Sequence, residues 1–231
     1  MNFSERMKAF LLDLLFPPRC IGCRGRGSWL CASCRDRLPV LPDAHCRRCA
    51  IPLAGVAVCP RCWRDPPPFE AIHCGFLFDG TIRHGIHQLK YRRGYHLAEP
   101  LAEVLLDVVG ELPPGLELIV PVPLHPQRQA ERGYNQSALL AKIVARRLDR
   151  PMRPDALERI RDTPAQMGLP AAKRGENVKG AFASRDPELQ GRTVLLVDDV
   201  TTTTSTLRAA SLALRQAGVT RIEVLVLART P

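Results

Sequence analysis

Two adjacent carboxylates followed by a run of hydroxyl side chains form the most chemically suggestive stretch of this chain. Asp198 and Asp199 come directly after the apolar run 194–197, and Thr or Ser occupies every position from 201 to 206. An uninterrupted apolar run is typical of a strand buried on both faces of a parallel sheet. Residues 207–214 then follow a helical pattern, so the acids and hydroxyls lie between a strand and a helix.

This order places the polar groups where α/β sheets bind their ligands. Ligands of open α/β sheets bind outside the carboxyl ends of the strands, and a helix N-terminus there offers free N–H groups to an anion. Carboxylates suit hydroxyls or a metal ion, so the segment suits a sugar phosphate. The alternative is an ordinary turn with a Ser or Thr cap, but two adjacent like charges add nothing to such a turn.

Eight of the nine cysteines form four CxxC pairs within 43 residues. Each pair brings two thiolates together on one tight turn, and two such turns close a tetrahedral zinc site. A disulfide framework would need an oxidising compartment, and we recognise no export signal. The pairs therefore predict two structural zinc sites, and leave open whether they combine consecutively or interleave. The predicted ligands are Cys20, Cys23, Cys31, Cys34, Cys46, Cys49, Cys59 and Cys62.

The cysteine-rich segment has few apolar side chains, so metal binding must supply most of its folding free energy. Many arginines flank the cysteine pairs. They could follow a phosphate backbone, or they could merely solvate a small domain, and both interpretations stay open. These arginines are Arg24, Arg26, Arg35, Arg37, Arg47, Arg48, Arg61 and Arg64. Cys74 lies apart in a strand-like run and is expected to be a buried core thiol.

The elements that must position these groups follow an alternating pattern. A proline-rich boundary at 65–69 separates a small module from a larger domain. Alternating strands and helices imply a mainly parallel sheet with helices on both faces, an α/β fold. We expect an N-terminal helix over residues 1–17, a zinc module over 18–65 and the α/β domain over 69–231. Strands are expected at 72–78, 118–120, 222–227 and, less regularly, 156–160, and helices at 82–91, 97–109, 137–148 and 207–217.

Two further polar segments could complete a site. Arg128 and Arg132 lie four residues apart after a proline-stiffened strand end, and guanidinium groups bind phosphates in a planar, bidentate way. The basic segment from Arg159 through Arg174 and Asn177 to Gly180 could be a mobile loop that closes over a ligand. His84 and His87 could form a ligand pair, although such a pair without nearby acids is more typical of a surface.

Composition limits the class of protein. The chain has 231 residues, 45% of them hydrophobic, which is ordinary for a globular protein. No apolar stretch is long enough to span a bilayer, so we expect a cytoplasmic protein. The formal charge of +10 falls to roughly +6 if two zinc sites each hold four thiolates. A basic balance favours anionic partners such as phosphates or nucleic acid.

Taken together, the motifs resemble the competence protein F family over nearly the whole chain. The resemblance rests on the cysteine module, the PVPLHP and RGYNQ segment from 121, the RDTPAQ segment from 161 and VLLVDDVTTTTST from 194. It implies a double zinc ribbon joined to a type I phosphoribosyltransferase domain that binds phosphoribosyl pyrophosphate with magnesium. It also implies a role in handling incoming single-stranded DNA with the competence machinery.

Carried over by resemblance, Asp198 and Asp199 would hold the ribose hydroxyls as the catalytic acids, and Arg128 and Arg132 would lie near the pyrophosphate. The 5-phosphate would bind at Thr202, Thr203, Thr204, Ser205 and Thr206.

Thr204 departs from the family pattern, which commonly has glycine there. Glycine permits a positive φ and a close approach of backbone to phosphate, and a β-branched residue disfavours both. We therefore expect either a negative φ at Thr204 or weaker phosphate binding, and turnover becomes uncertain. The sequence thus predicts a phosphoribosyltransferase-like protein acting in DNA uptake. The alternative is a non-catalytic adaptor for single-stranded DNA or proteins with a vestigial sugar-phosphate pocket.

Overall fold

A four-stranded parallel sheet forms the centre of the protein in the computed structural model, which describes residues 17–91, 94–161 and 180–230. The strands lie in the order β1 (Ile72–Leu77), β6 (Arg221–Arg229), β5 (Thr193–Thr201) and β2 (Leu118–Pro121). All three pairings are parallel, which confirms the α/β fold expected from the alternating pattern. β5 and β6 are almost entirely buried, as their continuous apolar runs predict.

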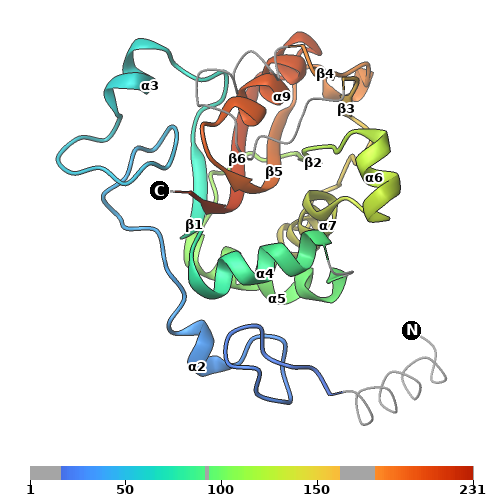
Figure 1. The fold of residues 1–231 in the computed structure, drawn as a ribbon. Helices are drawn as coiled ribbons and strands as arrows, with labels where there is room; N and C mark the ends of the chain where they lie inside the picture. The colour runs from blue at the N-terminus through green and yellow to red at the C-terminus, as the bar shows by residue number, and fades with distance from the viewer. Residues whose placement is uncertain (1–16, 92–93, 162–179, 231) are drawn as a thin grey trace.

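Helices cover both faces of this sheet (Figure 1). α4 (Gly80–Tyr91), α5 (Ala98–Val109) and α7 (Gln136–Leu148) share one apolar cluster with Leu195 and Val197 of β5. α9 (Ser205–Gln216) packs with Val194 and Leu196 on the other face. Alternate residues of β5 therefore enter opposite cores, as the two-residue period of a strand requires. No helix within the described residues is long and apolar enough to cross a membrane.

The two strands that flank β5 end at different positions along it, and this difference forms a step in the edge of the sheet next to the two acids. Pairing of β2 with β5 ends at Val197, whereas β6 stays paired with β5 as far as Thr201. Asp198 and Asp199 are thus still in strand conformation, beyond the end of one neighbouring strand but beside the other. The step leaves room next to the acids for side chains from the helices that follow β1 and β2.

Several elements differ from the sequence-based expectation. The proline-rich connection after β2 contains a helix, α6 (Pro126–Arg132), which begins with proline at its first position and ends at Gly133 with φ of 83°. The strand expected at 156–160 is only β3 (Glu158–Arg159), and it pairs antiparallel with β4 (Phe182–Ala183) in a separate sheet. Short 3₁₀ helices lie at η1 (Tyr95–Leu97) and η2 (Pro187–Leu189).

Two expectations cannot be compared with the structure. The helix expected over residues 1–17 lies outside the described residues except for Pro17. The same holds for most of the expected loop, including Arg174 and Asn177.

The cysteine module packs directly on the α/β domain. It contains α2 (Ala32–Arg35) and α3 (Pro60–Arg64). Ile21 and Leu38 join the apolar cluster of α4 and α5. Further along, the backbone N–H of Ile72 in β1 donates to the carbonyl of Arg47 at 3.0 Å. Apolar side chains of the module therefore pack against the larger domain. This contact compensates for the small number of core residues within the module itself.

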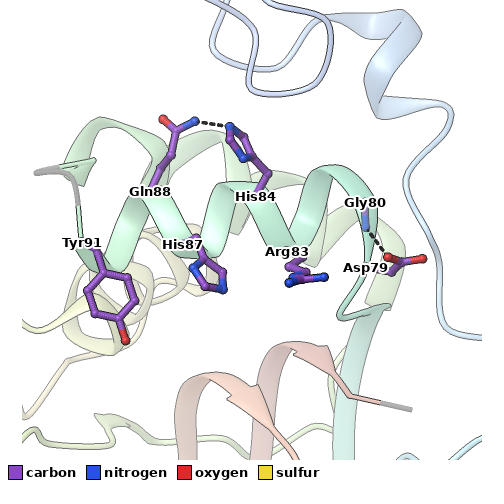
Figure 2. Close-up of a pocket in the computed structure, with 7 residues that line it drawn as sticks. All are labelled: Asp79, Gly80, Arg83, His84, His87, Gln88 and Tyr91. Atoms are coloured by element: carbon purple, nitrogen blue, oxygen red, sulfur yellow. Dashed lines mark hydrogen bonds between the residues drawn. The ribbon is translucent and has the colours of Figure 1, made fainter. Parts of the chain in front are cut away.

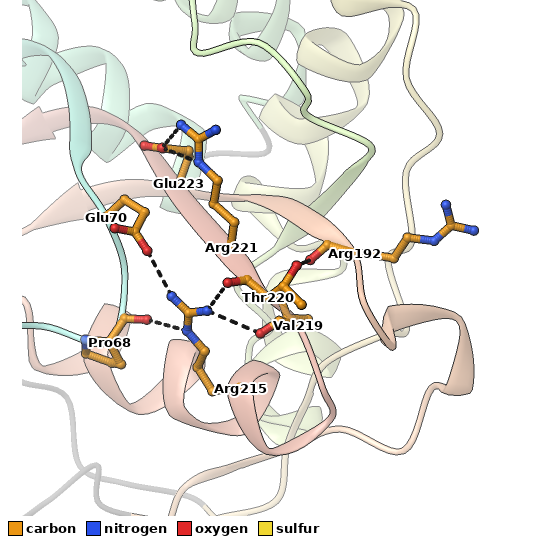
Figure 3. A network of polar contacts seen from close by, with 8 residues as sticks. All are labelled: Pro68, Glu70, Arg192, Arg215, Val219, Thr220, Arg221 and Glu223. Atoms are coloured by element: carbon orange, nitrogen blue, oxygen red, sulfur yellow. Dashed lines mark hydrogen bonds and ion pairs between the residues drawn. The ribbon is translucent and has the colours of Figure 1, made fainter.

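The amino-terminal end of the sheet carries a network of ion pairs (Figure 3). Arg215 of α9 pairs with Glu70 at 3.0 Å, and Arg221 pairs with Glu223 at 2.8 Å. Glu223 is buried and also contacts His73 of β1 at 2.9 Å. These contacts tie the chain together at the end of the sheet opposite the two acids.

Candidate functional site

The two acids are buried and held by side chains from two helices. The hydroxyl of Ser137 donates to Asp198 Oδ1 at 2.8 Å. The amide of Gln136 donates to Asp199 Oδ1 at 3.2 Å, and Lys90 Nζ lies 2.5 Å from Asp199 Oδ2. Gln136 and Ser137 begin α7, and Lys90 lies at the end of α4. The site thus forms where the ends of β5, α4 and α7 meet.

Burial changes the acidity of these groups. Removal from water, together with the neighbouring charge of Asp199, raises the pKa of Asp198 to about 7. For Lys90, burial acts to lower the pKa, but the charge of Asp199, its hydrogen bond to Lys90 and the charge of Asp198 together outweigh burial, and the pKa is raised. Lys90 therefore stays protonated and compensates one buried carboxylate, while Asp198 can hold or release a proton near neutrality.

The segment from Arg132 to Ser137 holds the start of α7 beneath the acids. Asn135 caps the helix, because its side-chain oxygen accepts from the Ser137 N–H at 2.9 Å, and its amide donates to the Val122 carbonyl at 3.0 Å. Arg132 donates a hydrogen bond to Gln136. The structure thereby connects Arg132 to Asp199 through one side chain. Arg128 lies one turn earlier in α6 and is half-buried.

The hydroxyl-rich turn leads from β5 into the buried N-terminus of α9. Thr202 and Thr203 form the turn, and Thr203 Oγ1 lies 2.9 Å from the hydroxyl of Ser205, the first residue of α9. Ser205 and Thr206 supply N–H groups of the first helical turn, which have no acceptor within the helix itself. A helix N-terminus in this position suits an anion, and binding of phosphate there stays a prediction.

The backbone conformation of Thr204 excludes one of the two alternatives expected from the sequence. It precedes α9 with φ of 64°, in the left-handed region, so the predicted negative φ is wrong. The turn from strand to helix places this residue in the left-handed region, which glycine adopts more readily than a β-branched residue. The side chain of Thr204 is buried and makes no capping hydrogen bond to the helix. The other expectation, weaker phosphate binding, stays a prediction.

Sequence reasoning missed both Ser137 and Lys90, which contact the acids. Lys90 is far from the acids along the chain, and only the packing of α4 against the sheet brings them together. One signal was available, because Arg83, His87 and Lys90 recur at helical spacing along one face of a predicted helix. His84 and His87 do not form a ligand pair, since they project from different sides of α4 (Figure 2).

The eight CxxC cysteines form two compact clusters, and the pairs combine consecutively. One cluster holds Cys20, Cys23, Cys31 and Cys34, and the other holds Cys46, Cys49, Cys59 and Cys62. All four sulfurs of each cluster lie within 4.8 Å of one another.

The dimensions of both clusters suit zinc. Tetrahedral zinc with bonds of about 2.3 Å places sulfurs about 3.8 Å apart. The Cys23–Cys31 and Cys49–Cys59 sulfur distances are 3.7 and 3.8 Å. Backbone N–H groups also approach the sulfurs, as at Gly25 N to Cys23 Sγ, 3.4 Å. Cys74, in contrast, lies alone in β1 and is buried, as expected.

Comparison with known proteins agrees with this architecture. The double zinc ribbon domain family matches residues 11–63, and the phosphoribosyl transferase domain family matches residues 135–231. Competence protein F of Haemophilus influenzae is 35% identical over 226 residues, covering 91% of this chain and 96% of the relative. The chain belongs to the competence protein F family.

Other relatives of this competence F family protein have names that refer to DNA utilization or to competence. The DNA utilization protein YhgH of Escherichia coli K12 is 34% identical over 227 residues, covering 94% of this chain and 99% of the relative. Competence protein ComFC of Bacillus subtilis is 24% identical over 196 residues, covering 82% of this chain and 79% of the relative. The family thus combines a double zinc ribbon with a phosphoribosyltransferase domain, and its names refer to competence and DNA utilization.

Proposed function

We propose that this protein binds phosphoribosyl pyrophosphate with magnesium at the segment 198–206 and transfers its phosphoribosyl group during DNA utilization. One observation carries the proposal: two buried carboxylates and the N-terminus of α9 lie at the same carboxyl edge of a parallel sheet. Carboxylates suit the two ribose hydroxyls, and the N–H groups at a helix N-terminus suit the 5-phosphate.

The residues act by position and charge. The turn 202–206 would hold the 5-phosphate, while Asp198 and Asp199 orient the ribose and stabilise positive charge that develops at the anomeric carbon. Lys90 and Arg132 would lie on the side where negative charge collects on the pyrophosphate. Carboxylate oxygens are ligands of the type that magnesium prefers, so the donor set is compatible with the ion. Magnesium bound to the pyrophosphate would neutralise its charge.

Isothermal titration with phosphoribosyl pyrophosphate in magnesium buffer tests the site. We expect saturable binding by the wild type and at least about tenfold weaker binding by Asp198→Asn/Asp199→Asn, because two charged hydrogen bonds are worth about 1.5–3 kcal/mol each. Asp155→Asn, an exposed acid outside the site, is the matched control. Absence of binding by the wild type would refute the proposal, and equal binding by the double variant would refute the assignment of the acids.

A second function is favoured by the surface of the zinc ribbons. Arg24, Arg26, Arg47 and Arg61 are all exposed there, and the relatives include DNA utilization proteins. The ribbons would then bind single-stranded DNA through its phosphates. Such binding falls steeply with salt, by about 0.7 log units per phosphate contact for each tenfold rise. A fluorescence-anisotropy salt series on the wild type and an Arg24→Gln/Arg26→Gln/Arg61→Gln variant tests this, and a flat salt response would contradict it.

A further inference from the structure

Arg229, the last residue of β6, is a buried cation that no carboxylate among the described residues pairs with. It is 6% exposed. Its Nη1 donates to the carbonyl of Cys49 at 2.6 Å, and its Nε has no hydrogen-bond partner within the part of the chain that the structure describes. A buried charge is costly unless an opposite charge compensates it. Arg229 therefore needs a negative charge close by.

The nearby thiol of Cys74 does not supply this charge. Burial raises the pKa of the Cys74 thiol to about 12, although the charge of Arg229 acts to lower it. The thiol therefore stays neutral near pH 7, and it donates a hydrogen bond to the carbonyl of Phe76 at 3.5 Å.

The second cysteine cluster supplies a negative charge when it holds zinc. Four thiolates around one divalent ion leave two net negative charges, and Cys49, whose carbonyl Arg229 contacts, is one of the four predicted ligands. Arg48 also approaches this cluster, since it donates to the carbonyl of Cys62 at 3.2 Å, but its side chain is only half-buried. Because Arg229 is buried, water and salt screen its attraction to the cluster far less.

The backbone of Arg229 lies beside the start of the hydroxyl-rich turn. Arg229 is paired with Thr201 in the register of β6 and β5, and the N–H of Thr230 donates to the carbonyl of Thr201 at 3.0 Å. Thr201 is the last residue of β5 and directly precedes the turn. A displacement of Arg229 would therefore reach the residue from which the turn begins.

The second ribbon also contacts the other end of the turn. The backbone N–H of Arg208 in α9 donates to the carbonyl of Thr204 at 2.9 Å. The guanidinium of Arg208 donates to the carboxylate of Asp65 at 2.8 Å, and Asp65 directly follows α3, which contains Cys62. Both ends of the turn are thus connected to the second ribbon.

We infer that Arg229 is a positioning residue that couples the second zinc cluster to the hydroxyl-rich turn 202–206. Its charge compensates the zinc-bound thiolates, and its backbone holds Thr201 at the start of the turn, so zinc at this cluster raises the affinity of the turn for phosphate. The role in phosphate binding rests on the proposed function. Because coupling between two binding sites is reciprocal, bound phosphoribosyl pyrophosphate should tighten zinc binding at the second cluster by the same factor.

Competition with a chelator tests this coupling on the zinc-loaded full chain, without any change to Arg229. Bound zinc is measured at equilibrium over a range of chelator concentrations, with and without saturating phosphoribosyl pyrophosphate and magnesium. Cys23→Ser, which disables the first cluster, identifies the signal of the second. We expect phosphoribosyl pyrophosphate to raise the chelator concentration that removes this zinc about fivefold, the lower end of usual coupling factors. Direct capture of zinc by phosphoribosyl pyrophosphate would act in the opposite direction.

Substitution of Arg229 tests the path of the coupling. Arg229→Gln should release zinc from the second cluster more readily and should show no protection by phosphoribosyl pyrophosphate. Arg229→Lys keeps the charge and should lie closer to the wild type in zinc retention. Arg48→Gln removes a guanidinium that donates to a carbonyl of the same cluster, and it is the matched control that should keep the protection.

The outcomes separate this inference from the proposed function. If phosphoribosyl pyrophosphate binds the wild type but leaves zinc retention unchanged, the coupling is refuted and the proposed function stands. Protection that persists in Arg229→Gln would overturn the role of Arg229. If the wild type does not bind phosphoribosyl pyrophosphate, the proposed function fails. Zinc retention still tests the charge compensation in that case, because equal retention by Arg229→Gln and the wild type would overturn it.

Discussion

Thr204 carries backbone strain at the point where the proposed phosphate would bind. A non-glycine residue in the left-handed region costs about 1–3 kcal/mol, and Thr204 has φ of 64°. We expect Thr204→Gly to raise the free energy of unfolding by about 1 kcal/mol and to tighten binding of phosphoribosyl pyrophosphate. Chemical denaturation and calorimetric titration measure the two effects.

Thr203→Gly provides the control for this prediction. Thr203 precedes Thr204 in the same turn, but its φ is not positive. Glycine there relieves no strain and adds freedom to the unfolded chain, so it should lower stability. If both glycine variants changed stability in the same direction, strain at Thr204 would not be the cause.

Asp198 should make stability depend on pH. Its pKa is raised from 3.8 to about 7 in the folded protein, so the folded state keeps a proton that the unfolded state loses near pH 4. The free energy of unfolding contributed by this group therefore falls as pH rises from about 4 to 7. Asp198→Asn should unfold like the wild type at pH 4. At pH 8 it should be more stable by about 1 kcal/mol or more, since one pKa unit corresponds to about 1.4 kcal/mol.

Urea denaturation of both proteins across this pH range measures the difference. Glu111→Gln, an exposed acid after α5, is the control and should show no comparable pH-dependent gain. A gain for Asp198→Asn that was constant with pH would indicate a packing effect rather than proton binding.

Among the elements, α4 connects the candidate site to the first zinc cluster. Its Lys90 compensates the buried Asp199, and removal of one partner leaves a buried charge unpaired. We expect Lys90→Met to lower the free energy of unfolding by about 2 kcal/mol at pH 7. The double variant Lys90→Met/Asp199→Asn should recover much of this loss, because no unpaired charge remains. Additive losses in this double-mutant cycle would contradict a direct interaction.

The elements also show which features a sequence can predict. The parallel sheet, the acids and the cysteine pairs are encoded locally, in apolar runs and short spacings. Helix α6 was not predicted because the segment after the strand was interpreted as a proline-stiffened connection, although proline is favoured at the first helical position. The ion pair of Lys90 with Asp199 and the position of the Arg132 guanidinium over the Tyr91 ring depend on how elements distant in the sequence pack. No local pattern specifies that packing.

At the scale of the whole molecule, both cysteine clusters are connected to the α/β domain, but they differ in exposure. Ile21, beside the first cluster, lies in the apolar cluster of α4 and α5. The buried Arg229 of β6 donates to the carbonyl of Cys49 in the second cluster at 2.6 Å. Loss of either metal should therefore disturb the α/β domain as well as the ribbon, because binding energy at such sites is folding energy.

Exposure should decide which metal leaves first. Cys23 is exposed and Cys31 is half-exposed, whereas all four cysteines of the second cluster are buried. We expect the zinc-loaded protein to release two metal ions to excess chelator in two phases, the faster from the first cluster. Cys23→Ser should remove the fast phase and leave the slow phase intact, as a colorimetric zinc assay would measure. Since Ile21 packs on α4, amides of 82–91 should exchange hydrogen faster after the first phase. Release of both ions in one phase would contradict the argument from exposure. Unchanged exchange in α4 would show that the first ribbon is not coupled to the candidate site.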